Sequence, residues 1–326
     1  MASNAKIVLV PDSMGHQGVE ILKAREDIEV VVYDPSLKPA AFHALLATAS
    51  GISLSFTPYR RPEMDASPLM QVVARIGVGF DAVEVPALTA RRVPLMVAGA
   101  ANSVSVAEQA VFFIMALAKR AAYLDALVRH NRWNERMAVL PGEVAGKTVL
   151  VIGFGRIGTR TARRCAALDM DVVVHDPYVP AETIVAAGYR HAPSLGAVLP
   201  HADYVTIHCP KTQETIDMFD AARIARMKPG AGLVNTARGG IVNEAALYDA
   251  LVSGHLRGAA LDVFDSEPAK PGNPLFRLEQ VLMAPHMAGV TVESVAAMSV
   301  AVARNILSVF DGSPIAENVI NKEVLS

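Results

Sequence analysis

Short apolar, β-branched runs alternate with helix-like stretches along the chain. In the first hundred residues such runs occur at Lys6–Val10, Ile28–Tyr33, Ile52–Phe56 and Val72–Val78, and the helix-like stretch Val19–Arg25 separates the first two. This alternation predicts strands of a parallel sheet covered by helices. We therefore expect an α/β fold whose first block is a small, doubly wound sheet.

A long apolar segment follows this block. Asn102 and Ser103 are good N-caps for a helix over Val104–Leu127, which is too long and too uniformly apolar for an exposed helix. A helix of this kind usually packs between domains or between subunits.

A second alternation begins at Gly146 and predicts a second doubly wound sheet. After Gly289 one more helix-like stretch, Val292–Phe310, precedes a short tail. The expected strands of the second sheet are Thr148–Ile152, Val172–Val174, Tyr204–Ile207, Leu233–Val234, Ala259–Leu261 and Val281–Met283.

Composition narrows the class of protein. With 326 residues, two domains are the default expectation, and a net charge of −2 without a basic run argues against nucleic acid as a partner. Only Cys165 and Cys209 are present and the nine histidines are scattered, so we expect neither disulfides nor a metal site, and a cytoplasmic location. The apolar run Ala110–Ala118 is about half of the roughly 20 residues that span a bilayer, which predicts a buried helix and no membrane partner.

A dinucleotide fingerprint follows the strand Thr148–Ile152. Gly153-Phe154-Gly155-Arg156-Ile157-Gly158 has the form GxGxxG and opens a predicted helix, Ile157–Leu168. The glycines permit a tight turn, close approach of a pyrophosphate and close helix–strand packing. Asp176 ends the next strand about 20 residues on, where an acid binds the ribose. Because this acid would repel the 2′-phosphate of NADP, NAD is the expected cofactor.

Polar side chains follow four later strands, and the carboxyl ends of parallel strands form the ligand-binding edge of such sheets. They are His208, Arg238, Asp262 and His286. Reduction of a keto acid requires a cation for the carboxylate and carbonyl and an acid for the forming alkoxide. Arg238 suits the first role and His286 the second, with Glu267 orienting the imidazole. Taken singly, each is more often a surface or turn residue.

Several motifs in order give the chain a close resemblance to the D-isomer-specific 2-hydroxyacid dehydrogenases. Besides Gly153–Gly158, they are Gly77-Val78-Gly79-Phe80-Asp81, Ser105-Val106-Ala107-Glu108, His208-Cys209-Pro210-Lys211-Thr212, Asn235-Thr236-Ala237-Arg238-Gly239-Gly240, Asp262-Val263-Phe264 with Glu267-Pro268, and Pro285-His286-Met287-Ala288-Gly289.

The resemblance implies a Rossmann NAD-binding domain at 102–289, inserted into a discontinuous flavodoxin-like substrate domain of residues 1–101 and 290–326. It implies domains that close over the substrate and a homodimer built largely on the helical segment after Asn102. Arg238, Glu267 and His286 would be catalytic, with Asp262 near the nicotinamide carboxamide. The expected cofactor-binding residues are Gly153, Gly155, Arg156, Ile157, Gly158, Asp176, His208, Pro210, Thr236, Ala237, Asp262 and Gly289.

Substrate recognition would fall to the first block. The resemblance implies that the amides of Val78 and Gly79 hold the substrate carboxylate, and Ser55 lies on a loop expected to face the substrate. Arg75, just before the glycine loop, could bind a second anion at the far end of the substrate, whereas Arg60 and Arg61 are better explained as a solvated surface. Hydroxypyruvate or glyoxylate is the first expectation and phosphohydroxypyruvate the second.

Alternatives remain open. Gln109 stands where many family members carry histidine, which we expect to affect helix packing only. Formate dehydrogenases of this fold use glutamine where Glu267 stands, which argues against that activity. The same fold also serves as an NAD(H)-sensing binding module in corepressors, and such modules can retain the catalytic residues. An L-specific lactate or malate dehydrogenase is rejected, because its dinucleotide loop lies at the N-terminus.

Overall fold

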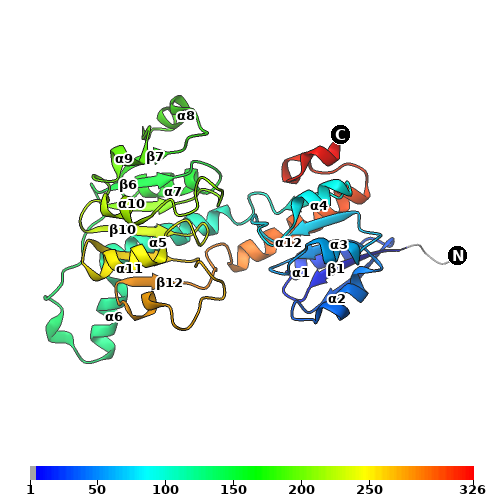
Figure 1. Cartoon of the computed structure of the whole chain (residues 1–326), viewed down its shortest axis with the longest axis horizontal. Coiled ribbons are helices and arrows are strands. Elements are labelled where there is room, and N and C mark those ends of the chain that lie inside the picture. Colours follow the sequence, from blue (N-terminus) through cyan, green and yellow to red (C-terminus); the bar gives the residue numbers. More distant parts are fainter. Residues whose placement is uncertain (1–4) are drawn as a thin grey trace. The chain divides into compact units, whose positions relative to one another are not determined.

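The computed structural model describes residues 5–326, which form two compact units (Figure 1). Unit 1 contains the chain up to Asn102 together with residues 290–326, and unit 2 contains Ser103–Gly289. Each unit is built on one wholly parallel sheet, which confirms the prediction of an α/β fold with two doubly wound sheets.

The sheet of unit 1 has the strand order β2-β1-β3-β4-β5. The elements of this unit are β1 (Lys6–Pro11), α1 (His16–Lys23), β2 (Ile28–Tyr33), α2 (Pro39–Leu46), β3 (Ala49–Leu54), α3 (Arg61–Asp65), β4 (Val72–Arg75), α4 (Val85–Ala90), β5 (Leu95–Val97), α12 (Val292–Phe310) and the short 3₁₀ turns Ala316–Asn318 and Lys322–Leu325.

Alternating side chains of these strands bury the two faces of the sheet. In β1, Val8 and Val10 pack in the cluster that contains α1 and α12, whereas Leu9 packs in the cluster that contains α2, α3 and α4. The helix α12 is long and apolar enough to cross a membrane by length and composition. Its contacts with α1, β3, β4 and β5 show it instead as a core helix of unit 1.

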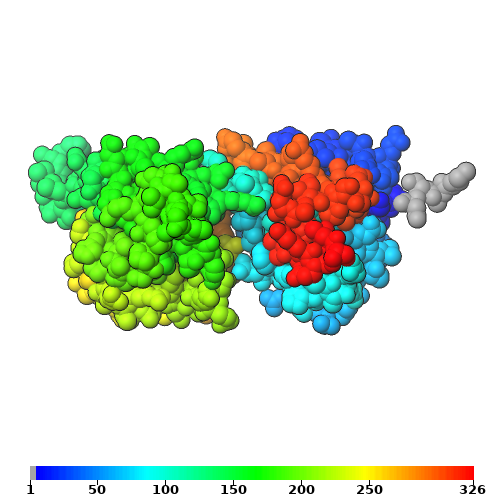
Figure 2. Space-filling view, turned by 90° about the horizontal axis from the view of Figure 1, so that it is seen from above, coloured from blue at the N-terminus to red at the C-terminus, as the bar shows by residue number. Residues whose placement is uncertain are grey.

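Close contacts fix both ends of the C-terminal segment on unit 1. A Cβ on Gly18 of α1 would lie 2.2 Å from the carbonyl oxygen of Ser299, so glycine lets α1 and α12 approach. Farther along, the side chain of Asn321 accepts the amide of Leu95 in β5 at 2.8 Å and donates to the carbonyl oxygen of Val93, just before this strand, at 2.9 Å. The resulting turns cover part of the surface of this unit (red in Figure 2).

Unit 2 has the strand order β12-β11-β10-β9-β6-β7-β8. Its elements are α5 (Ser103–Lys119), α6 (Ala121–Arg129), the 3₁₀ turn Trp133–Glu135, β6 (Thr148–Ile152), α7 (Gly158–Ala166), β7 (Asp171–His175), α8 (Ala181–Ala186), β8 (Arg190–His191), α9 (Leu195–Val198), β9 (Tyr204–Ile207), α10 (Ala221–Ala225), β10 (Ala231–Asn235), α11 (Glu244–Val252), β11 (Leu256–Leu261), the 3₁₀ turn Pro274–Arg277 and β12 (Val281–Met283).

The chain order reverses direction in this sheet between β6 and β9, which is the switch point at which such sheets bind dinucleotides. The central strands β9 and β10 are buried along their whole length. Helices α5, α7 and α8 cover one face, and α9, α10 and α11 cover the other.

The predicted helix Val104–Leu127 is wrong as a single helix. The structure ends α5 at Lys119 and starts α6 at Ala121, because Arg120 has left-handed backbone angles (φ 51°, ψ 43°) that no α-helix continues through. The predicted strand Val72–Val78 stops at Arg75, since Gly77 turns the chain with φ 117°. Five other elements have the predicted ends, namely β2, β6, β9, β12 and α12. The rest occur with shifted ends; β3, for example, covers Ala49–Leu54 in place of Ile52–Phe56.

Candidate active site

The predicted glycine motif forms the turn between β6 and α7, and each of its glycines meets a different constraint. Gly153 has φ 91°, and a Cβ there would lie 2.9 Å from the backbone of His208. A Cβ on Gly158 would lie 1.9 Å from the carbonyl oxygen of Gly153, so only glycine allows α7 this close to the turn. A Cβ on Gly155 would meet nothing within 4 Å. The open space at Gly155 is the approach that a bound pyrophosphate requires.

Asp176 directly follows β7 and lies against this turn. Its Oδ2 accepts the amide of Phe154 at 2.7 Å, and its Oδ1 accepts the amide of Tyr178 at 2.9 Å. These two bonds hold the carboxylate at the carboxyl end of β7, beside the glycine turn. Because each carboxylate oxygen can accept more than one hydrogen bond, ribose hydroxyls can be bound there as well.

Two polar atoms at the ends of β9 and β10 are buried without a hydrogen-bond partner among residues 5–326. They are Nδ1 of His208 and Oγ1 of Thr236. His208 donates to or accepts from Thr206 at 3.0 Å through Nε2, and burial holds the pKa of His208 well below its ordinary value. Buried polar atoms without partners are uncommon in proteins, and a polar ligand would satisfy both.

The next strand ends carry the three residues that were predicted to be catalytic. His286 and Glu267 form a pair, with Nδ1 of His286 2.7 Å from Oε2 of Glu267. The other oxygen of Glu267 accepts the amide of Phe264 at 3.1 Å. Burial raises the pKa of Glu267, but the hydrogen bonds from His286 and Phe264, together with the charges of His286 and Arg238, outweigh it and lower that pKa overall.

Asp262 fixes the backbone that presents His286. This buried carboxylate accepts the amides of Met287 and Ala288 at 2.8 Å each, and its carbonyl oxygen accepts the amide of His286 at 2.8 Å. The three bonds hold His286 at φ 56°, a left-handed conformation that is costly for a residue with a side chain. Burial raises the pKa of Asp262, although both accepted amides oppose it. Gly289, which was predicted to bind cofactor, directly follows this turn.

Arg238 lies on the turn after β10, and its Nη1 donates to the carbonyl oxygen of Ala237 at 2.7 Å. Asn235, which is buried, shapes this turn: its amide donates to the carbonyl oxygen of Arg238 at 2.9 Å and its Oδ1 accepts the amide of Ala237 at 3.0 Å. This role of Asn235 was not predicted from the sequence, although an asparagine at a strand end before a turn is a recognisable signal.

The predicted substrate residues lie in unit 1, at the carboxyl ends of β3 and β4. Ser55 directly follows β3, and Val78 and Gly79 lie on the loop that Gly77 turns. The guanidinium of Arg75 donates to the carbonyl oxygens of Ile76 at 2.9 Å and Leu54 at 3.4 Å. It also lies over the ring of Phe56, 5.4 Å from the centroid.

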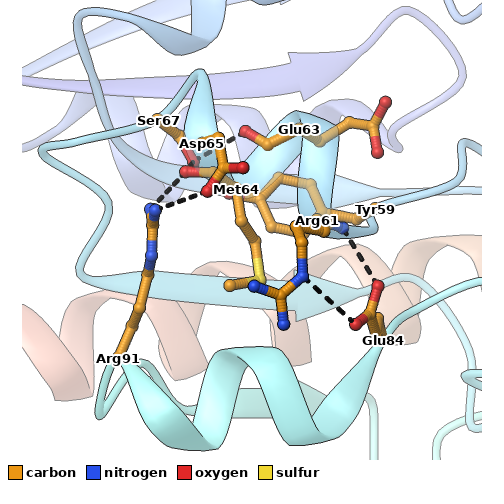
Figure 3. A network of polar contacts seen from close by, with 8 residues as sticks. All are labelled: Tyr59, Arg61, Glu63, Met64, Asp65, Ser67, Glu84 and Arg91. Atoms are coloured by element: carbon orange, nitrogen blue, oxygen red, sulfur yellow. Dashed lines mark hydrogen bonds and ion pairs between the residues drawn. The ribbon is translucent and has the colours of Figure 1, made fainter.

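Arg60 and Arg61 have surface roles, and Figure 3 shows Arg61 beside Glu84. Arg61 begins α3, donates its amide to Glu84 at 3.1 Å and has a side chain that is 71% exposed. The amide of Arg60 is bound by Glu63, which caps the same helix. These contacts support the interpretation of Arg60 and Arg61 as a solvated surface.

The parallel sheet of unit 2 thus has the strand order of dinucleotide-binding proteins, and the His286–Glu267 pair and Arg238 lie at its carboxyl edge. The arrangement defines a class: a dinucleotide-binding α/β protein with groups suited to acid–base chemistry. Among the described residues, no cluster of three histidine, cysteine or acidic side chains is suited to hold a metal ion.

Comparison with known proteins places the chain in this class more narrowly. Residues 111–288 match the model of the D-isomer specific 2-hydroxyacid dehydrogenase, NAD binding domain. The chain belongs to the D-isomer specific 2-hydroxyacid dehydrogenase family. This match confirms the predicted family and NAD as the cofactor. The two buried polar atoms without partners and the open space at Gly155 fit NAD.

Three relatives illustrate the likeness. The chain is 33% identical over 314 residues to a D-3-phosphoglycerate dehydrogenase of Archaeoglobus fulgidus, covering 96% of this chain and 59% of that protein. It is 36% identical over 265 residues to a glyoxylate reductase of Thermofilum pendens, covering 80% and 78%. The solved structure of a D-lactate dehydrogenase from Aquifex aeolicus, complexed with NAD and lactic acid, superposes with a TM-score of 0.85 at 26% identity, covering 96% and 99%. The chain spans little more than half the length of the phosphoglycerate dehydrogenases that it matches.

Proposed function

We propose that this protein is an NAD-dependent oxidoreductase that interconverts a small D-2-hydroxy acid and its 2-keto acid. The observation that carries the proposal is the 2.7 Å pair of His286 and Glu267 on the same sheet edge as Arg238 and the dinucleotide turn. NADH, when bound, supplies the hydride. Arg238 holds the substrate carboxylate and polarises the keto group, because a guanidinium stays charged and binds a carboxylate through two donors.

In this proposal His286 moves the proton. Glu267 accepts from Nδ1 and thereby fixes the ring, so Nε2 is the nitrogen that gives a proton to the forming alkoxide. In the direction of oxidation the same nitrogen takes the proton from the hydroxyl group.

The test follows NADH absorbance with glyoxylate, hydroxypyruvate, pyruvate, phosphohydroxypyruvate, sulfopyruvate and oxaloacetate. The expected result is turnover of at least one keto acid that is lost in His286→Ala, with NADH binding retained. NADPH is run in parallel. Tight NADH binding without turnover of any keto acid would contradict the dehydrogenase proposal and favour the alternative, an NAD(H)-sensing binding protein of the same fold.

For the substrate we propose hydroxypyruvate or glyoxylate first and an anionic keto acid such as phosphohydroxypyruvate second. The likeness to a glyoxylate reductase supports the first, and the likeness to phosphoglycerate dehydrogenases supports the second. The cation of Arg75 at the end of β4, beside the glycine loop, would bind the distal anion. Arg75→Ala should then raise KM for phosphohydroxypyruvate at least tenfold more than KM for glyoxylate, and equal losses would refute the assignment.

We also propose a cytoplasmic homodimer built on the segment from α5 to Leu140. This segment exposes several large apolar side chains, which a second copy of the chain would cover. They are Phe112, Val128, Trp133, Met137 and Leu140, each more than half exposed. Light scattering after gel filtration should give twice the chain mass for the wild type and a single chain mass for a Val128→Asp, Trp133→Ser variant; a monomeric wild type would overturn the proposal.

A further inference from the structure

The turn that carries Arg238 is in direct backbone contact with the loop that carries Glu267. A Cβ on Gly239 would lie 1.8 Å from the carbonyl oxygen of Phe264, which means that the two backbones touch there. The amide of the same Phe264 donates to Glu267. The position of the guanidinium and the position of the carboxylate therefore depend on one shared contact.

Asp265 joins these two loops by hydrogen bonds. Its Oδ1 accepts the amide of Gly240 at 2.8 Å, across 25 residues of sequence. Its own amide donates to Oε1 of Glu244 at 2.7 Å, and Oε2 of Glu244 accepts from the side chain of Asn273 at 2.6 Å. Glu244 lies in the first turn of α11, so the loop after β11 is anchored to a helix on one side and to the Arg238 turn on the other.

We propose that Asp265 is a positioning residue that aligns Arg238 with the His286–Glu267 pair. The inference rests on the proposed function, because it concerns the geometry of the same reaction. Asp265 acts through the Gly240 amide, which directly follows the turn of Arg238 and Gly239. A misplacement of catalytic groups by about 1 Å can lower a rate as much as about 100-fold, so loss of the hydrogen bond between Asp265 and Gly240 should lower the rate.

The hydrogen bond, and not the charge, is the feature that the Arg238 turn needs. Partial burial and the neighbouring carboxylates of Glu244 and Asp217 raise the pKa of Asp265, against the Gly240 amide and Lys211, which lower it. The surroundings thus make the charged form of Asp265 less favourable than in water, and a neutral acceptor of the same shape can accept the same hydrogen bond from Gly240. Asparagine is such an acceptor, and alanine is not.

The experiment compares Asp265→Ala, Asp265→Asn and the control Asp249→Ala, which removes an exposed acid from α11 of the same unit. Asp265→Ala should lower kcat about tenfold and leave KM for NADH within twofold, since loss of a hydrogen bond to a carboxylate is worth about one factor of ten. Asp265→Asn should stay within threefold of the wild type, as should Asp249→Ala.

Amide hydrogen exchange provides a reading that does not depend on turnover. The peptide containing Gly240 should exchange faster in Asp265→Ala and at the wild-type rate in Asp265→Asn. Unchanged exchange and unchanged kcat in Asp265→Ala would overturn the inference, and an equal loss in Asp265→Asn would show that charge is the essential feature, which also overturns it. A wild-type protein that turns over no keto acid overturns the proposed function and with it the catalytic role of Asp265, while the exchange rates still decide whether the tie exists.

Discussion

The same methyl group added at two glycines of the dinucleotide turn should have different effects on stability. At Gly155 a Cβ would meet no protein atom within 4 Å, and its φ is one that alanine adopts. Gly155→Ala should therefore leave the free energy of unfolding unchanged or raise it by about 0.4–1 kcal/mol, because alanine has less conformational entropy to lose. The same methyl group would fill the space through which a pyrophosphate approaches the backbone.

At Gly158 the added Cβ would lie 1.9 Å from the carbonyl oxygen of Gly153, about 1.5 Å inside the 3.4 Å at which ordinary contact begins. Backbone must move to relieve this overlap, since neither atom belongs to a flexible side chain. Gly158→Ala should lower the free energy of unfolding by at least about 1–3 kcal/mol, the usual cost of overpacking. It should weaken NADH binding as well, because the displaced backbone forms the turn.

Urea denaturation and titration of NADH fluorescence measure the two quantities separately. We expect Gly155→Ala to match or slightly exceed the wild type in its urea midpoint and to lose at least about tenfold in NADH affinity, about 1.4 kcal/mol. Gly158→Ala should lower both the urea midpoint and the affinity for NADH. Gly188→Ala serves as a control in urea unfolding. Gly188 also has open surroundings but a positive φ, so the added methyl group should lower the free energy of unfolding through backbone strain alone. Wild-type NADH affinity in Gly155→Ala would refute the assignment of this space to the cofactor.

Three further predictions concern the polar residues of unit 2. Because the pKa of Glu267 is lowered in the folded protein, its stabilising effect is present above its ordinary pKa and is lost as pH falls through the lower folded value. The difference in melting temperature between the wild type and Glu267→Gln should therefore be present near pH 6–7 and shrink progressively once the pH falls below about 4.3, the ordinary carboxyl pKa, and a constant difference would contradict this sign. Asn235→Ala should lower the free energy of unfolding, measured in urea, by about 1–3 kcal/mol, because it leaves the Ala237 amide and the Arg238 carbonyl without their buried partner. A urea midpoint equal to that of the wild type would show that water replaces the Asn235 side chain. Asp176→Ala should weaken NADH more than NADPH and so narrow the ratio of their KM values about tenfold, and an unchanged ratio would remove Asp176 from cofactor selection.

The sequence was sufficient to predict the sheets because their strands are buried on both faces. Strands such as β6 and β9 are continuous apolar runs that end at glycine or histidine, and their ends were predicted to the residue. The strands β5 and β8, three and two residues long, carry no periodic pattern of their own and were not predicted. The break at Arg120 was missed for a related reason: no glycine or proline marks it, and only tertiary packing places a left-handed residue there.

The candidate site could be predicted from the sequence where a polar side chain comes soon after a strand. Arg238 and His286 were predicted from their places after strands, and Glu267 was predicted as the carboxylate that orients the imidazole. The structure brings His286 and Glu267 into hydrogen-bond contact. Asp265 was not proposed, because its partner, the Gly240 amide, is 25 residues distant and its motif neighbours carry the recognisable chemistry. Contacts between loops of this kind depend on strand order, which spacing along the chain does not reveal.

The strand order also separates the two halves of the proposed reaction. Asp176 follows β7 and Glu267 follows β11, and β6, β9 and β10 lie between these strands in the sheet. Four inter-strand spacings amount to about 19 Å, well beyond the roughly 7–10 Å within which substitutions usually couple. The effects of Asp176→Ala and Glu267→Gln on kcat/KM should therefore multiply in the double variant, measured with NADH and the best keto acid. A deviation from the product of more than threefold would show that cofactor selection and proton transfer are coupled through the sheet edge, and that the two halves do not act independently.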